Sequence, residues 1–217
     1  MIQVEVWGDY ALFSRPELKV ERMSYDVMTP SAARGILEAV YWHPGMKWVI
    51  ERIHVLAPIR FTSVRRNEVL SPISAQNVRT AMTGGKKDLY LSAPDEIVQR
   101  ASLLLQDVRY VIDAHFDITP QANPGDNAGK FQDIMKRRLE KGACYAQPYL
   151  GCREFPAGFR RWPGGPVPTH PSLAGERDLG LMLHDMDYSD PQDIQPVFFR
   201  AVLRDGVLEA AGQEVHR

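Results

Sequence analysis

The chain has 217 residues, a hydrophobic fraction of 44%, a charged fraction of 24% and a formal net charge of −1, which are ordinary values for a soluble globular protein with one core and a small annex. It shows neither an apolar run of membrane-spanning length nor a basic region followed by an apolar run at Met1, so we expect neither a membrane protein nor a secretory signal. Its two cysteines, Cys144 and Cys152, form neither a disulfide scaffold nor a zinc signature, and we expect a cytoplasmic, reducing location.

The first predicted element is a β-strand at the start of the chain. Ile2, Val4 and Val6 alternate with Gln3 and Glu5, a pattern typical of a strand with one buried face. Trp7 falls on the opposite, polar face. It either packs beneath a loop, as large aromatic side chains commonly do, or offers a stacking surface to an unpaired base, and both alternatives stay open.

A helix is predicted next, beginning at Pro30. Thr29 is a suitable N-cap, and proline suits the first helical position, where its missing N–H costs nothing. An apolar stripe with i, i+3, i+4 and i+7 spacing faces the core and comprises Ala33, Ile36, Leu37 and Val40. Pro44 ends the helix, which puts Tyr41 in the last turn at the margin of the stripe, where a phenol can reach out of the core.

A second strand is predicted over 53–61, in which Pro58 indicates an edge position or a bulge. The segment 62–88 that follows is basic, and its candidate phosphate contacts are Arg65, Arg66, Arg79, Lys86 and Lys87. Residues 60–161 carry 16 basic and 11 acidic side chains, whereas residues 170–217 carry 4 and 9. The basic middle either supplies a phosphate-binding surface or is a solvated surface with an uneven charge distribution.

A strand over 107–119 and a helix over 130–141 come next. The predicted core face of the strand comprises Val108, Tyr110, Ile112, Ala114, Phe116 and Ile118. His115 therefore lies on the other, mostly polar face. In the helix, Arg137 and Arg138 suit the negative end of the helix dipole, which makes them second-choice RNA contacts, and Gly142 is a natural stop.

Further strands are predicted over 149–157, 179–186 and 196–204, and Arg204-Asp205-Gly206 reads as a hairpin turn. The order strand, helix, strand, insertion, strand, helix, strand is the split β-α-β plan. We therefore predict an α+β fold with a ferredoxin-like domain over 1–165, a long basic insertion at about 62–100, and a small C-terminal antiparallel β-sheet domain over 166–217.

Three separated motifs resemble the CRISPR-associated fifth Cas family, in particular its subtype I-C (Dvulg) branch. They are Trp7-Gly8-Asp9-Tyr10-Ala11, the helix segment from Thr29 to Ala39, and Gly151-Cys152-Arg153-Glu154-Phe155. The resemblance covers nearly the whole chain and implies the RAMP version of the ferredoxin-like fold. It also implies an endoribonuclease that cuts precursor CRISPR RNA at the base of the repeat hairpin. Such a protein then stays on the 5′ handle as part of the Cascade surveillance complex.

The resemblance also implies the catalytic residues. Cleavage in the family is independent of metal and depends on a tyrosine near the end of the first helix and on a Lys-His pair in a later strand. Tyr41 matches the tyrosine and His115 the histidine, whereas Ala114 stands in place of the lysine. The missing cation could come from one of three lysines, Lys47, Lys86 and Lys87.

The chemistry required is modest, because RNA carries its own nucleophile. A 2′-OH attacks the adjacent phosphorus once a base removes its proton and a cation offsets the phosphorane charge. An imidazole titrates near neutral pH, so we assign His115 as general base or acid. A phenol does not titrate there, so we assign Tyr41 as a positioning group or as a hydrogen-bond donor to the leaving oxygen. The expected products are a 2′,3′-cyclic phosphate and a 5′-hydroxyl. Without the resemblance, Tyr41 reads as a core tyrosine, and His115 reads equally well as a surface residue ion-paired with Asp113 or Asp117.

Two functions follow from these expectations. The first is the metal-independent endoribonuclease, and the second is a non-catalytic Cascade subunit that grips the handle, or duplex DNA, with the same basic insertion. The expected partners are precursor CRISPR RNA and other Cascade subunits, with no membrane, metal or cofactor. His43 and His54 have no identifiable partner in the sequence and are treated as structural.

Overall fold

The computed structural model describes residues 1–18, 20–86 and 89–217. The chain divides into two compact units, one made of residues 1–62 and 103–217 and the other of residues 63–102. Both α-helices and β-strands are present, so the predicted α+β class is confirmed. None of the helices in the described ranges is long and apolar enough to cross a membrane.

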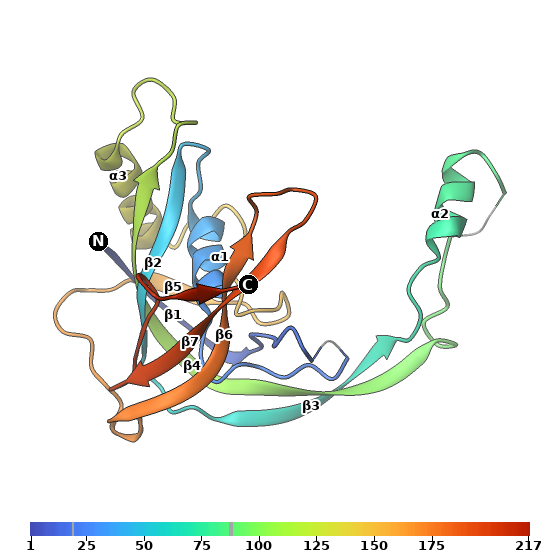
Figure 1. The fold of residues 1–217 in the computed structure, drawn as a ribbon, viewed down its shortest axis with the longest axis horizontal. Coiled ribbons are helices and arrows are strands. Elements are labelled where there is room, and N and C mark those ends of the chain that lie inside the picture. Colours follow the sequence, from blue (N-terminus) through green and yellow to red (C-terminus); the bar gives the residue numbers. More distant parts are fainter. Residues whose placement is uncertain (19, 87–88) are drawn as a thin grey trace. The chain divides into compact units, whose positions relative to one another are not determined.

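The larger unit is built around an antiparallel sheet (Figure 1). Along the sheet the strands run β5-β1-β4-β2-β8-β7-β6, and β9 pairs with β7. Their bounds are β1 Ile2–Ala11, β2 Met46–Val55, β4 Ile97–Ile118, β5 Gly158–Arg161, β6 Glu176–Asp187, β7 Gln195–Arg204, β8 Val207–Glu209 and β9 Val215–His216. Helix α1 (Pro30–Val40) connects β1 to β2, and α3 (Ala128–Lys141) connects β4 to β5, which is the split β-α-β connectivity.

The C-terminal strands continue this sheet. Strand β8 pairs with β2 on one side and with β7 on the other, so β6 and β7 extend the central sheet. The predicted hairpin is present, with Asp205 and Gly206 at φ values of 46° and 74° between β7 and β8. The sequence predicted a separate C-terminal β-sheet domain, whereas these strands join the central sheet through β8, a pairing between distant segments that the sequence of each strand does not encode.

Helices α1 and α3 cover one face of the sheet. The side chains buried in the common core come from α1 (Ala33, Ile36, Leu37, Val40), α3 (Phe131, Met135, Leu139), β1 (Val4, Val6), β2 (Trp48, Ile50, Ile53) and β4 (Tyr110, Ile112, Ala114). The predicted stripe of α1 and the predicted core face of β4 are therefore confirmed. Ile118 is the exception, because it lies at the end of β4 and is exposed.

The ends of α1 follow from local hydrogen bonds. The Thr29 hydroxyl accepts the backbone N–H of Ala32 at 3.2 Å, as expected for an N-cap, and Pro30 occupies the first turn. The helix ends at Val40, so Tyr41 is its C-cap and does not lie within the last turn as predicted. Tyr41 has extended dihedrals (φ −153°, ψ 124°), and its carbonyl accepts the indole N–H of Trp48 at 2.9 Å. The last turn thus ends where β2 supplies a partner for the backbone.

Two predicted strands are wrong. The second strand occupies Met46–Val55, not 53–61, because the chain turns into β2 directly after Pro44. Residues 149–157 form a tight loop in which Leu150 N–H donates to the Phe155 carbonyl at 2.8 Å. Gly151 has a φ of 85°, and a Cβ there would lie 2.0 Å from the Leu12 carbonyl oxygen. The loop therefore requires a glycine at this point, which explains one residue of the third motif.

The smaller unit, residues 63–102, contains most of β3 (Phe61–Val69), the helix α2 (Ala75–Met82) and the start of β4. Sequence analysis predicted a basic insertion here but not its helix. Ser74 caps α2 by accepting the N–H of Asn77 at 3.4 Å. No side chain of α2 is buried among the described residues, so this helix has no core of its own.

Candidate active site

Tyr41 lies in a small cluster between the end of α1 and helix α3. Its side chain is 7% exposed, and its ring contacts the ring of Phe131 edge-on with centroids 6.2 Å apart. The guanidinium of Arg138 lies 5.3 Å from the centre of the Tyr41 ring and donates to the Val40 carbonyl at 2.7 Å. The Tyr41 phenol therefore lies close to both the Phe131 ring and the Arg138 guanidinium, which its hydrogen bond holds in place.

His43 belongs to the same cluster. Its ring packs against Phe131 at a centroid distance of 5.1 Å, so one phenylalanine supports both His43 and Tyr41. The His43 Nδ1 accepts the backbone N–H of Gly45 at 3.1 Å and lies 3.7 Å from the Asp126 carboxylate. The imidazole is therefore held on one side by its own loop, with the proton of the neutral ring on Nε2 and a carboxylate close to Nδ1.

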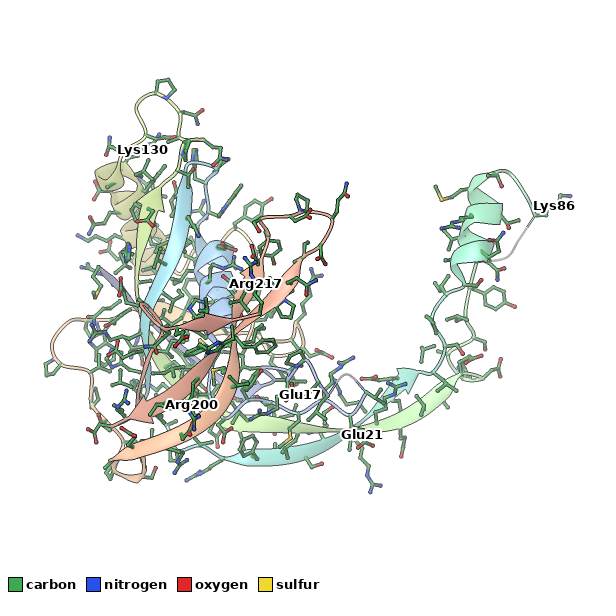
Figure 2. All side chains as sticks on the ribbon, in the orientation of Figure 1. Glu17, Glu21, Lys86, Lys130, Arg200 and Arg217 are labelled. Carbon is green, nitrogen blue, oxygen red and sulfur yellow. The ribbon has the colours of Figure 1, made fainter. Side chains whose placement is uncertain are left out.

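Lys130 completes the arrangement from the first turns of α3, where Figure 2 labels it. Its ammonium donates to Asp126 at 2.7 Å, four residues earlier in the chain. The side chain of Asp126 is almost fully covered, whereas that of Lys130 is half exposed. The ammonium is thus anchored by a carboxylate while part of it remains accessible to a ligand.

The charges around the cluster act on its titratable groups in a consistent way. Burial raises the pKa of Tyr41, although Lys130 and Arg138 pull the pKa back down. The phenol therefore stays protonated at neutral pH and can donate a hydrogen bond. The hydrogen bond from Lys130 lowers the pKa of Asp126, and the same hydrogen bond raises the pKa of Lys130. Both members of this pair are consequently charged near neutrality.

His115 lies on the opposite face of the sheet from this cluster. Phe116, its neighbour in β4, points to the helix side, where its ring contacts Phe131 at 5.9 Å. Successive side chains of a strand point to opposite faces, so His115 points away from the helices. The expectation that folding brings Tyr41 and His115 to one site is wrong. The catalytic role predicted for His115 stays a prediction.

The neighbours of His115 are acidic. Its Nδ1 lies 2.7 Å from a Glu51 carboxylate oxygen, and its Nε2 lies 3.5 Å from Asp117. Lys47, the predicted third cation, is exposed on β2 directly opposite Asp117 in the strand register. Of the two carboxylates expected beside His115, Asp113 instead accepts hydrogen bonds from Gln3 and pairs with His54. Two carboxylates beside one imidazole disfavour the approach of a polyanion.

The predicted phosphate contacts of the basic insertion lie in the smaller unit. Arg65 is exposed, whereas Arg66, next to it in β3, is half-buried and 3.4 Å from Glu68. Arg79 is exposed in the last turn of α2, and Lys86 is exposed in the loop after it (Figure 2). Lys87 lies outside the described residues. Among the residues that are described, no group of three His, Cys, Asp or Glu side chains could hold a metal ion.

Sequence analysis missed His43, Lys130 and Asp126. One signal was available, since Asp126 and Lys130 have the i, i+4 spacing of a helical ion pair next to the N-cap Asn127. The proximity of His43 to Lys130 had no local signal, because the two belong to segments far apart in the sequence that meet only in the folded chain, through contacts such as His43 with Phe131 and Asp126.

Comparison with known proteins shows the family. The family model described as CRISPR-associated protein (Cas_Cas5), in its Cas5d form, matches residues 1–211 of the chain. The chain belongs to the Cas5d family. It is 50% identical over 212 residues to the CRISPR pre-crRNA endoribonuclease Cas5d of Mannheimia succiniciproducens, covering 96% of this chain and 93% of that protein.

A second Cas5d relative is more distant. The CRISPR pre-crRNA endoribonuclease Cas5d of Thermus thermophilus is 39% identical over 236 residues, covering 100% of this chain and 95% of that protein. A solved structure described as a CRISPR RNA-guided surveillance complex contains a chain with the same fold, at a TM-score of 0.51 and 14% identity, covering 99% and 90% of the two chains. The resemblance seen in the three sequence motifs is therefore confirmed at the level of the Cas5d family.

Proposed function

We propose that this Cas5d protein is a metal-independent endoribonuclease that cuts precursor CRISPR RNA at the base of the repeat hairpin. It then remains on the 5′ handle as a Cascade subunit. The names of its two relatives support the reaction. A neighbour of the same fold in a surveillance complex supports the assembly, and the strand order β5-β1-β4-β2 supports a ferredoxin-like RAMP domain.

The observation that carries this proposal is the gathering of Tyr41, His43, Lys130 and Arg138 around Phe131. RNA cleavage by its own 2′-OH needs a proton acceptor, a proton donor and a positive charge near the phosphate. The cluster contains an imidazole, a phenol and two cations within two short segments of the chain. The surroundings of His115 contain an imidazole and two carboxylates, and the predicted cation Lys47 stands opposite one of them, Asp117, in the strand register.

Each residue has a definite task in this scheme. For His43 to accept the 2′-OH proton at Nε2, the proton of its neutral ring first moves to Nδ1, beside the Asp126 carboxylate at 3.7 Å, and the hydrogen bond from the Gly45 N–H is released. The 2′-oxygen then bonds to phosphorus and the bond to the 5′-oxygen breaks. Tyr41, protonated because burial raises its pKa, donates to the leaving 5′-oxygen. Lys130 and Arg138 offset the charge of the phosphorane, and the products are a 2′,3′-cyclic phosphate and a 5′-hydroxyl.

The test is cleavage of the cognate repeat RNA in EDTA. We expect one discrete cut at the base of the hairpin, with a cyclic phosphate identified by mass spectrometry of the 5′ fragment. The matched control is the same RNA with a 2′-deoxy sugar at the cut position, which removes the nucleophile and is expected to stay intact. Tight binding without cutting would instead favour a non-catalytic Cascade subunit. A cut that requires Mg²⁺ would contradict metal independence.

A further inference from the structure

A second concave site lies on the sheet face opposite the Tyr41 cluster. It is a groove of about 490 Å³ that opens between β1, β4, β5 and the segment after β2, and it is lined in part by Trp7, Arg109, Arg160, Asp9 and Asp107. Trp7 is 38% exposed, so the large indole contributes open surface to the groove. The groove is separate from the residues assigned to cleavage, which lie on the helix side of the same sheet.

The position of Trp7 is set by the strand register. Trp7 pairs with Arg109 of β4 on one side and with Gly158 of β5 on the other. A Cβ on Gly158 would lie 2.4 Å from the indole ring, so the glycine gives the ring room to lie over the edge strand. Arg160 lies above the ring at 5.5 Å from its centre. Trp7 is therefore partly open to solvent, and its stacking on an unpaired base stays a prediction.

The two arginines of the groove are held in place by one buried carboxylate. Glu5 is 1% exposed and accepts a hydrogen bond of 2.6 Å from the Nε of both Arg109 and Arg160. Burial raises the pKa of Glu5, but the two arginines outweigh it and the net pKa is lowered. Glu5 is thus ionised, and the two guanidinium groups carry one positive charge more than this carboxylate, whereas Asp9 and Asp107 bring the formal charge of the whole groove to −1. Both arginine side chains remain about half exposed, with N–H groups available to a ligand.

Two further carboxylates make the groove mixed in charge. Asp9 and Asp107 line it, and Asp107 has a left-handed backbone with a φ of 53°. A non-glycine residue in this region is uncommon, and Asp107 adopts it within β4. A uniformly basic groove would suit any phosphate chain. An aromatic face flanked by guanidinium groups and carboxylates suits a ligand that has a phosphate, a flat ring and hydrogen-bond donors.

We propose that this groove binds one unpaired nucleotide of single-stranded RNA whose base carries an exocyclic amino group. The base stacks on Trp7, its phosphate contacts Arg109 or Arg160, and the amino group donates to Asp107 or Asp9. Cytosine, adenine and guanine have this donor and uracil does not. The inference rests on the proposed function for its RNA partner, since a retained 5′ handle would supply such a nucleotide.

The experiment compares two oligonucleotides that differ only in this donor, octacytidylate and octauridylate, with binding followed by fluorescence anisotropy. We expect the wild-type protein to bind octacytidylate about fivefold more tightly, as one base-edge contact allows. Trp7→Leu is expected to weaken octacytidylate binding by about tenfold through loss of stacking. Asp107→Asn, which keeps a residue type that tolerates the left-handed backbone, is expected to remove the preference for cytosine.

Matched controls come from exposed side chains outside the groove. Tyr188→Leu and Arg204→Gln remove an exposed aromatic ring and an exposed, carboxylate-paired arginine, and both are expected to bind octacytidylate as the wild type does. If Trp7 is needed for the fold, Arg160→Gln tests the same site through a smaller salt dependence of binding. Equal binding of the two oligonucleotides by the wild type, or unchanged binding by both Trp7→Leu and Arg160→Gln, would overturn the proposal. Failure of the wild type to cut repeat RNA would instead refute the proposed function, because this binding assay contains no cleavage step.

Discussion

His43→Ala is expected to lower the single-turnover rate of repeat-RNA cleavage by about 10²–10⁴-fold, the range in which a general base or acid contributes. The imidazole is the group in the Tyr41 cluster suited to accept the 2′-OH proton near neutral pH. Its removal leaves Phe131 and the cations in place, so the affinity for the hairpin should change little. Cleavage is measured with protein in excess over labelled RNA, and affinity with the 2′-deoxy RNA.

His115→Ala is the matched control, because it removes an imidazole from the opposite face of the same sheet. We expect this variant to cut at nearly the wild-type rate. His43→Gln serves as a second variant, since its side chain can still accept the Gly45 N–H that holds the loop. The reverse pattern, with His115→Ala inactive and His43→Ala active, would move the reaction to the polar face of the sheet.

Lys130→Gln is expected to lower the cleavage rate by about 10²–10³-fold, comparable to the loss of one preorganised group that stabilises developing charge. The ammonium is held 2.7 Å from Asp126 and remains half exposed, so it is prepared to face the phosphate without being ordered at the moment of reaction. The substitution also removes the hydrogen bond that lowers the pKa of Asp126. That pKa is then expected to rise, so the carboxylate would lose its charge at a higher pH than in the wild type.

Two substitutions separate this effect from a general loss of charge. Lys141→Gln removes an exposed lysine from the other end of α3 and is expected to cut as the wild type does. Lys130→Arg keeps the positive charge and should recover most of the activity. If Lys141→Gln and Lys130→Gln were equally impaired, the role of Lys130 would be ordinary electrostatic attraction of RNA. Rates are compared at saturating protein so that affinity does not enter.

Much of the fold was predictable because its signals are local. The N-cap Thr29, the stripe on α1 and the stop at Gly142 depend on residues within a few positions of one another. The alternation in β4 likewise gave the correct face for His115. The loop at Gly151 was mistaken for a strand, in part because the lack of space for a side chain there arises from Leu12, a residue far away in the sequence.

The pairing of Tyr41 with His115 could have been rejected from the sequence alone. The apolar stripe of α1 must pack on the apolar face of the sheet, and the alternation of β4 put His115 on the other face. The predicted packing of α1 and the predicted face of His115 were both correct. Together they put Tyr41 and His115 on opposite faces of the sheet, which excludes a site that contains both. The site proposed instead, with His43 near Lys130, could not be predicted from the sequence. It depends on how α3 packs against the end of α1 through Phe131.

The central claim is that the scissile phosphate meets the protein on the helix side of the sheet. The direct measurement is photo-crosslinking of repeat RNA that is uncleavable through a 2′-deoxy sugar and carries 4-thiouridine next to the cut position, with the crosslinked peptide identified by mass spectrometry. We expect crosslinks within residues 41–46 and 126–141. Crosslinks confined to residues 109–117, which include His115, would contradict the account.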